Sequence, residues 1–315
     1  MDRILVLLLL ALPASGKSEI RRYLEHAVPR LPALPLGPTI QLDDYPYVHL
    51  MRVISAEESR LGIPPTFFAS TDASFMDARD WLTLVHLINE DYASLGLARA
   101  HDPDPAALLE RLDRARSAAG IPGLHMGRDG RIAVAIASEA AHLAACIPVV
   151  ALTSLAESTV IIEFARGGPE GAALPLPEPY GYRCSLAALS PEILERAGIL
   201  YVWVTPDESR RRNRERATPG REGDASILHH GVPESVMRND YGIDDIGWLA
   251  DTADVPGTIT VGVDSHRIDV PFARFDNRVD RTSFLRDDPA SWPAQRLAIL
   301  HDDLAAALGR LAQSI

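Results

Sequence analysis

The sequence contains few of the residues that mark disulfide-stapled or disordered proteins. Only two cysteines occur in 315 residues, Cys146 and Cys184, and no C-x-x-C spacing is present. Neither a disulfide framework nor a zinc site is therefore indicated, and we expect two reduced, packed thiols of a cytoplasmic protein. Aromatic residues make up only 6% of the chain, but 47% of all residues are hydrophobic. That share is enough to bury a large core, in one big domain or two small ones.

An excess of positive charge is also lacking. Lysine and arginine number 31 against 43 aspartate and glutamate residues, which gives a formal net charge of -12. Proteins that coat nucleic acid or an anionic membrane neutralise phosphates with lysine and arginine. We therefore expect neither extended nucleic-acid binding nor membrane binding, and any anionic ligand must be met by a local cluster of cations.

Only one long apolar run is present, from Ile4 to Leu12 after Arg3. With Ala14-Ser15-Gly16 behind it, this run has the pattern of a short secretory signal, which would make the chain a secreted binding protein. A buried parallel strand is also a continuous apolar run. We favour the strand, because the supposed cleavage region coincides with a phosphate-binding motif.

That motif spans residues 11–18, A-L-P-A-S-G-K-S, and matches the consensus G-x-x-x-x-G-K-[ST] except that Ala11 replaces the first glycine. Helical spacing follows it at Ile20, Tyr23 and Leu24, so the order strand, loop, helix is satisfied. In such a loop the backbone N–H groups and the helix N-terminus bind phosphate, the lysine reaches the β/γ oxygens and the hydroxyl ligates Mg²⁺. The predicted nucleotide-binding residues are Pro13, Ala14, Ser15, Gly16, Lys17 and Ser18, with Ser18 also a metal ligand.

Strands and helices alternate along the rest of the chain. Further strands are predicted over residues 39–42, 159–164 and 199–204, with a late hairpin or strand pair over 258–263 and 268–275. We therefore predict the α/β class: a three-layer sandwich around a mostly parallel five-stranded sheet. It should form a single domain over residues 1–315, with a helical insertion at about 64–156 and an arginine-rich lid at about 206–250.

These features resemble those of the P-loop kinases, the nucleoside- and small-metabolite-kinase branch of the P-loop NTPases. The resemblance is tightest over residues 4–28. It implies a P-loop NTPase sheet, ATP and Mg²⁺ as cofactors, and an acidic residue after strand two near the acceptor hydroxyl. Asp43 or Asp44 occupies that place, and phosphoryl transfer needs such a carboxylate to orient or accept the proton of the attacking hydroxyl. The alternative is that the pair only caps the following helix.

Four further residues are implied by the resemblance. Glu163 stands where the family has a second acidic strand end and could hold a Mg²⁺-bound water or contact substrate, although an ion pair with Arg166 is an equal alternative. In the arginine-rich segment, Arg212 and Arg216 share a helix face and would close on the γ-phosphate, unless the helix is simply solvated. Asn277 falls where related kinases contact adenine.

Other parts of the sequence carry weaker signals. The pair His229-His230 lacks a third ligand at metal-like spacing and indicates a surface turn. Trp81, His86 and Tyr92 look like a helix face in the core.

The function predicted from the sequence is an ATP- and Mg²⁺-dependent phosphotransferase that acts on a hydroxyl of a small molecule or nucleotide. An RNA- or polynucleotide-end kinase shares the same parts. A nucleotide-dependent switch or ATPase without an acceptor is the alternative from another class. The sequence identifies neither the acceptor nor the oligomeric state.

Overall fold

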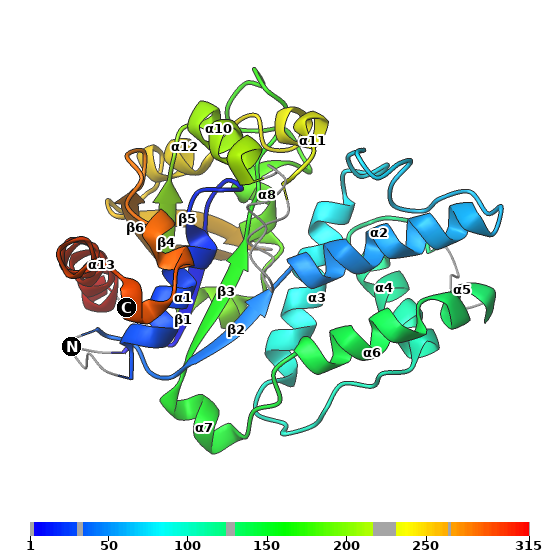
Figure 1. Ribbon diagram of the computed structural model, residues 1–315, viewed down its shortest axis with the longest axis horizontal. Helices are drawn as coiled ribbons and strands as arrows, with labels where there is room; N and C mark the ends of the chain where they lie inside the picture. The colour runs from blue at the N-terminus through cyan, green and yellow to red at the C-terminus, as the bar shows by residue number, and fades with distance from the viewer. Residues whose placement is uncertain (1–2, 30–33, 124–129, 217–230, 264–265, 315) are drawn as a thin grey trace.

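The structure, a computed structural model, describes residues 3–29, 34–123, 130–216, 231–263 and 266–314. Its strands form one sheet (Figure 1). They are β1 (Val6–Leu10), β2 (Thr39–Asp43), β3 (Thr159–Phe164), β4 (Ala197–Trp203), β5 (Thr258–Val263) and β6 (His266–Asp276). In space the order is β2-β3-β1-β4-β6-β5, with only β5 and β6 antiparallel.

The α/β class and the mostly parallel sheet are confirmed, but the predicted count of five strands was wrong, because the sheet has six. The late strand pair explains the difference. One of its strands, β6, joins the parallel sheet beside β4, and the other, β5, pairs antiparallel to β6 and becomes an added edge strand.

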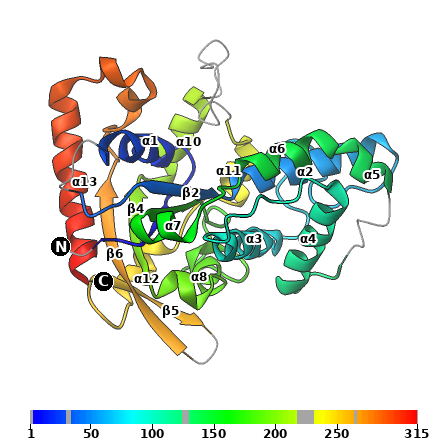
Figure 2. The same ribbon diagram turned by 90° about the horizontal axis from the view of Figure 1, so that it is seen from below.

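Helices cover both faces of the sheet (Figure 2). The helices are α1 (Lys17–Ala27), α2 (Tyr45–Arg60), α3 (Asp80–Ser94), α4 (Pro105–Ala118), α5 (Gly130–Ala135), α6 (Ala137–Cys146), α7 (Leu152–Glu157), α8 (Gly181–Ala187), α9 (Pro191–Leu194), α10 (Pro206–Arg216), α11 (Glu234–Asn239), α12 (Ile246–Asp251) and α13 (Ala294–Ser314). Helices α1 and α13 lie on one face, where Tyr23 and His301 share a hydrogen bond of 2.7 Å. Helices α8 and α12 lie on the other.

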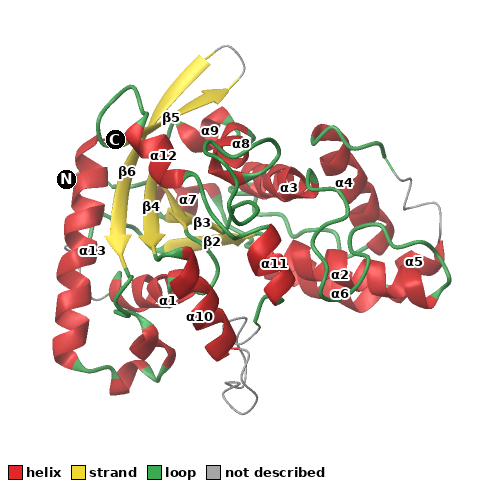
Figure 3. Cartoon of the chain, turned by 90° about the horizontal axis from the view of Figure 1, so that it is seen from above, coloured by secondary structure: helices red, strands yellow, loops and turns green. Residues whose placement is uncertain are grey.

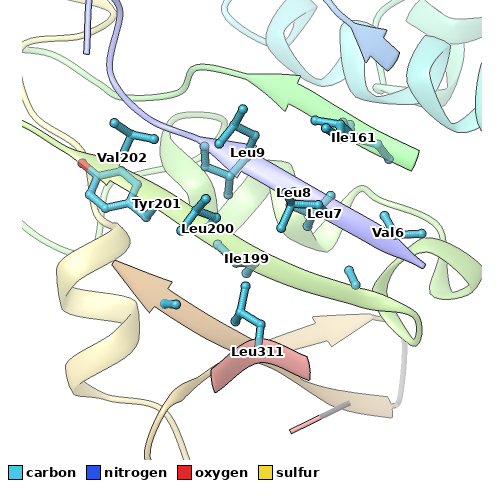
Figure 4. Close-up of a cluster of buried hydrophobic side chains, with 14 of the residues drawn as sticks. Val6, Leu7, Leu8, Leu9, Ile161, Ile199, Leu200, Tyr201, Val202 and Leu311 are labelled. Carbon is cyan, nitrogen blue, oxygen red and sulfur yellow. The ribbon is translucent and has the colours of Figure 1, made fainter. Parts of the chain in front are cut away.

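The sheet is the centre of the larger hydrophobic core (Figure 4). All five residues of β1 are buried, and Leu8 packs near Ile199 of β4 and Leu311 of α13. The apolar run at the start of the chain therefore supplies the central strand, as the strand interpretation predicts.

A second core belongs to the helices between β2 and β3. Helices α2 to α6 form a lobe beside the β2 edge of the sheet (Figure 1), which we call the helical lobe. It includes α2, which precedes the predicted insertion at 64–156. Cys146, at the end of α6, is exposed rather than packed as expected.

Candidate functional site

The candidate site lies at the carboxyl ends of β1, β2 and β3. In the sheet, β3 and β2 lie on one side of β1, and β4 and β6 lie on the other. Ligands of open α/β sheets bind at the carboxyl ends of the strands where the strand order reverses in this way. A cleft of about 460 Å³ opens there. It is lined by residues 13–18, by Asp43, Asp44 and Glu163, by α2, and by parts of the segment 231–241. Figure 3 shows α11 between α10 and α2 at this edge.

The phosphate-binding motif forms a tight loop between β1 and α1. Ala14 has φ 55° and Gly16 has φ 100°, both left-handed. An added Cβ on Gly16 would lie 2.3 Å from Thr282 Oγ1, so the loop packs too closely for a side chain at this position. The helix begins at Lys17 without a side-chain cap, which leaves the N–H groups of its first turn available to a ligand.

Three side chains hold the carbonyl groups of this loop. Tyr182 donates a hydrogen bond of 2.9 Å to Ala11 O, Ser209 donates one of 2.7 Å to Pro13 O, and Asn277 donates one of 2.7 Å to Ser15 O. Because the carbonyl oxygens are held by the surrounding protein, the loop presents N–H groups to the cleft. This is the arrangement that binds an anion.

Charged residues gather beneath the loop. Ser18 Oγ donates a 3.0 Å hydrogen bond to Glu163 Oε1, and Lys17 Nζ lies 3.7 Å from the same oxygen. Arg21, one helical turn after Lys17, lies 3.4 Å from Asp43 Oδ2 and 3.5 Å from Glu163 Oε2. The strand register explains the meeting, because Asp43 and Glu163 are direct neighbours across β2 and β3.

The two aspartates have different surroundings. The pKa of Asp43 is raised to about 7, mainly by burial and then by the charges of Glu163 and Asp44, while the Tyr45 N–H and Arg21 oppose the rise. Asp44 instead forms a 2.5 Å ion pair with buried Arg166, whose guanidinium also donates to the carbonyl of Trp81. Asp44 is at the N-cap of α2, but its side chain makes no cap hydrogen bond. With a pKa of about 7, Asp43 can exchange a proton at neutral pH.

The alternative pairing of Glu163 with Arg166 does not occur, because Arg166 pairs with Asp44. Glu163 therefore faces Lys17 and Ser18.

Of the two predicted lid arginines, Arg212 lies away from the cleft, and the side chain of Arg216 is outside the described residues. Arg212 is buried on α10, where it donates to Glu208 and, at 2.6 Å, to Asn277 O, and it does not line the cleft. The backbone of α10 ends at Arg216. The structure describes neither the Arg216 side chain nor the pair His229-His230.

Asn277 is completely buried and does not line the cleft. Its side chain bonds to Ser15 O and, at 3.0 Å, to Thr282 Oγ1. In this position it supports the phosphate-binding loop.

Several lining residues were missed by the sequence analysis. Tyr45, Val48 and Arg52 project from one face of α2, and Trp81 and Tyr241 complete the wall beside them. The spacing i, i+3, i+7 along α2 is a usable signal for a common face. Trp81 is a core residue, as expected, and it also lines the cleft.

The described residues contain no group of three or more histidine, cysteine, aspartate and glutamate side chains that could by themselves hold a metal ion. Magnesium is commonly bound by one or two carboxylates together with waters and substrate phosphates. Ser18 and Glu163 offer such oxygen ligands, and Glu163 Oε2 is buried without a hydrogen bond in the described chain.

Comparisons with known family models, with curated proteins and with solved structures found no match. Among the helices described here, none is long and apolar enough to cross a membrane.

Proposed function

We propose that the chain is a P-loop kinase: an ATP- and Mg²⁺-dependent phosphotransferase that acts on the hydroxyl of a small molecule or nucleotide. One observation carries the proposal. A loop of N–H donors with Lys17 and a carboxylate of raised pKa, Asp43, line the same cleft of about 460 Å³. This arrangement suits a bound triphosphate and a separate acceptor hydroxyl. A cytoplasmic location, where ATP is available, accords with it.

The residues beneath the loop fit the cofactors. The N–H groups of residues 14–18 would bind the β-phosphate, and Lys17 would reach the β/γ oxygens. Ser18 and Glu163 would hold the cation, which when bound neutralises charge on the phosphates. Lys17 and Arg21 both lie beside Glu163, at 3.7 and 3.5 Å, so they would carry the electrostatic role that the lid arginines were expected to share.

Asp43 has the properties of the proton acceptor. In the transfer, the acceptor oxygen bonds to the γ-phosphorus, the bond from that phosphorus to the ADP oxygen breaks, and the hydroxyl proton passes to Asp43. Asp44, fixed by Arg166, would position the neighbouring backbone.

Thermal unfolding tests nucleotide binding. Wild-type and Lys17→Ala proteins would be melted with Mg²⁺ alone and with ATP, GTP or ADP. A nucleotide at one hundred times its Kd should add about 2.7 kcal/mol of stability, and we expect a shift with adenine nucleotides that Lys17→Ala loses. Arg60→Gln, an exposed residue at the end of α2, is the matched control. Absence of any nucleotide shift in the wild type overturns the proposal.

Transfer itself is tested by ADP release with and without alcohol acceptors. Stimulation by an acceptor, lost in Asp43→Asn, supports the kinase. Steady ADP release that no acceptor stimulates supports a switch or ATPase instead. Removal of Ile4 to Leu12 as a secretory leader would take away β1, the central strand, so the secreted alternative requires a different fold.

A further inference from the structure

Arg52 is held rigidly on the side of the cleft that α2 forms. Its guanidinium carbon lies 4.0 Å from the centre of the Phe68 ring. One terminal nitrogen donates to Thr71 O at 2.8 Å, and the other approaches Ala73 O at 3.4 Å. A stacked guanidinium with main-chain acceptors is fixed in place before any ligand arrives.

Arg52 differs from the other arginines around the cleft in having no carboxylate partner. Arg21 pairs with Asp43 and Glu163, and Arg166 pairs with Asp44. Within the described residues, Arg52 forms hydrogen bonds to carbonyl groups but no ion pair. Burial lowers the pKa of Arg52, and Asp72, which also lines the cleft, and Asp240 oppose this from beyond ion-pair distance.

Arg52 therefore lines the cleft with N–H donors to spare. A guanidinium carries five N–H donors, and the two carbonyl contacts use two of them. The group stays charged at neutral pH. A half-buried cation that lines a cleft without an anionic partner is suited to bind an anion from solution.

Part of the cleft that Arg52 lines is apolar. Val48, Trp81 and Tyr241 line it, and the Trp81 and Tyr241 rings meet edge to face with centroids 5.5 Å apart. Asp43, the last residue of β2, lines the same cleft, and α2 begins directly after it at Tyr45. An acceptor in this space meets a carboxylate, an apolar surface and a guanidinium.

We propose that the acceptor is a small molecule with an apolar body and an anionic group, carboxylate or phosphate, that binds Arg52 while its hydroxyl faces Asp43. This inference rests on the proposed function for the hydroxyl, but the anion site itself can be tested without nucleotide.

The test uses benzoate, phenyl phosphate and benzamide as probes, each titrated by thermal unfolding and by calorimetry. Benzamide matches benzoate in shape but has no charge, and the two anions separate a carboxylate from a phosphate preference. The proteins are the wild type, Arg52→Gln, Arg52→Lys and Arg60→Gln, all repeated with Lys17→Ala to weaken anion binding at the phosphate loop. Arg60 is on the same helix but is exposed and paired with Glu57, so it is the matched control.

We expect at least one of the two anions to bind at least tenfold more tightly than benzamide. Arg52→Gln should abolish the difference, Arg52→Lys should restore part of it, and Arg60→Gln should leave it unchanged. Equal binding of charged and neutral probes, binding of none, or anion binding that survives Arg52→Gln overturns the proposal. The nucleotide-dependent melting shift reports separately on the kinase, so either proposal can fail alone.

Discussion

At the scale of single residues, Asp43 shows how strand register changes acidity. Pairing of β2 with β3 puts Asp43 directly beside Glu163. Burial and that neighbouring charge raise the pKa of Asp43 to about 7, from an ordinary value of 3.8. Two adjacent carboxylates at a buried edge disfavour full ionisation.

The sign of the resulting pH dependence can be tested on the protein without ligand. Between pH 4 and pH 7 the folded state holds the Asp43 proton more tightly than the unfolded state, so this group favours folding at low pH and opposes it as pH rises to about 7. Asp43→Asn removes the effect. We expect it to raise the free energy of unfolding by about 1–3 kcal/mol more at pH 8 than at pH 4, measured by urea denaturation. An equal change at both pH values would contradict the raised pKa.

Substitution of Asp44, which pairs with Arg166, should lower the free energy of unfolding, whereas substitution of Asp43 should raise it. Arg166 is 2% exposed, so Asp44→Asn leaves a buried guanidinium without its carboxylate. Loss of one partner of such a pair costs about 3–5 kcal/mol, and Asp44→Asn with Arg166→Met should recover part of the loss. Chemical denaturation measures both. Glu57→Gln, which breaks the exposed pair with Arg60, should change stability by less than about 1 kcal/mol.

At the scale of elements, Gly16 joins the central strand to the helix that would bind phosphate. Its φ of 100° and the 2.3 Å approach to Thr282 predict that Gly16→Ala is strained twice. We expect a loss of about 2–4 kcal/mol in stability and loss of the nucleotide-dependent melting shift. Gly62→Ala is the control, because Gly62 has φ 73° but open space around its Cβ position. It should lose only about 1 kcal/mol; equal losses would mean that the contact with Thr282 is unimportant.

Elements with a strong local signal were predicted well. The β3 bounds match the apolar run at 159–164. The segment Thr205-Pro206-Asp207-Glu208 has the pattern of a helix N-terminus, and Thr205 Oγ1 accepts the Glu208 N–H at 3.2 Å at the start of α10. The short helix α8 was not predicted, because its start depends on a distant residue: Asp245 accepts the Tyr182 N–H at 2.6 Å.

The candidate site was predictable only where it is local in sequence. The motif at residues 11–18 and the strand-end acids Asp43 and Glu163 carry their own signals, and they meet in the structure. Arg52 is signalled only by its helix-face spacing with Tyr45 and Val48, and the pairing of Arg166 with Asp44 arises only when the ends of β2 and β3 approach in space. Arg212 carried a misleading signal, since its basic helix face packs inward on Asn277.

At the scale of the whole molecule, the cleft lies where two hydrophobic cores meet. The sheet core supplies the phosphate-binding loop, and the helical-lobe core supplies Trp81 and Tyr241. The formal net charge is -12, yet Lys17 and Arg52 line this cleft. An acidic protein can therefore bind anionic ligands through local cations.

Because the phosphate-binding loop and the helical lobe belong to different cores, ligand binding should slow backbone hydrogen exchange in one and not in the other. MgADP should protect the amides of residues 14–18 and the first turn of α1, because those N–H groups would acquire phosphate acceptors. Helix α4, in the helical lobe away from the loop, should exchange at an unchanged rate. Mass spectrometry of exchanged peptides measures both regions, and Lys17→Ala should abolish the protection at the loop. Uniform slowing over both cores would indicate general stabilisation, and unchanged exchange at the loop under saturating MgADP would show that phosphate is bound elsewhere.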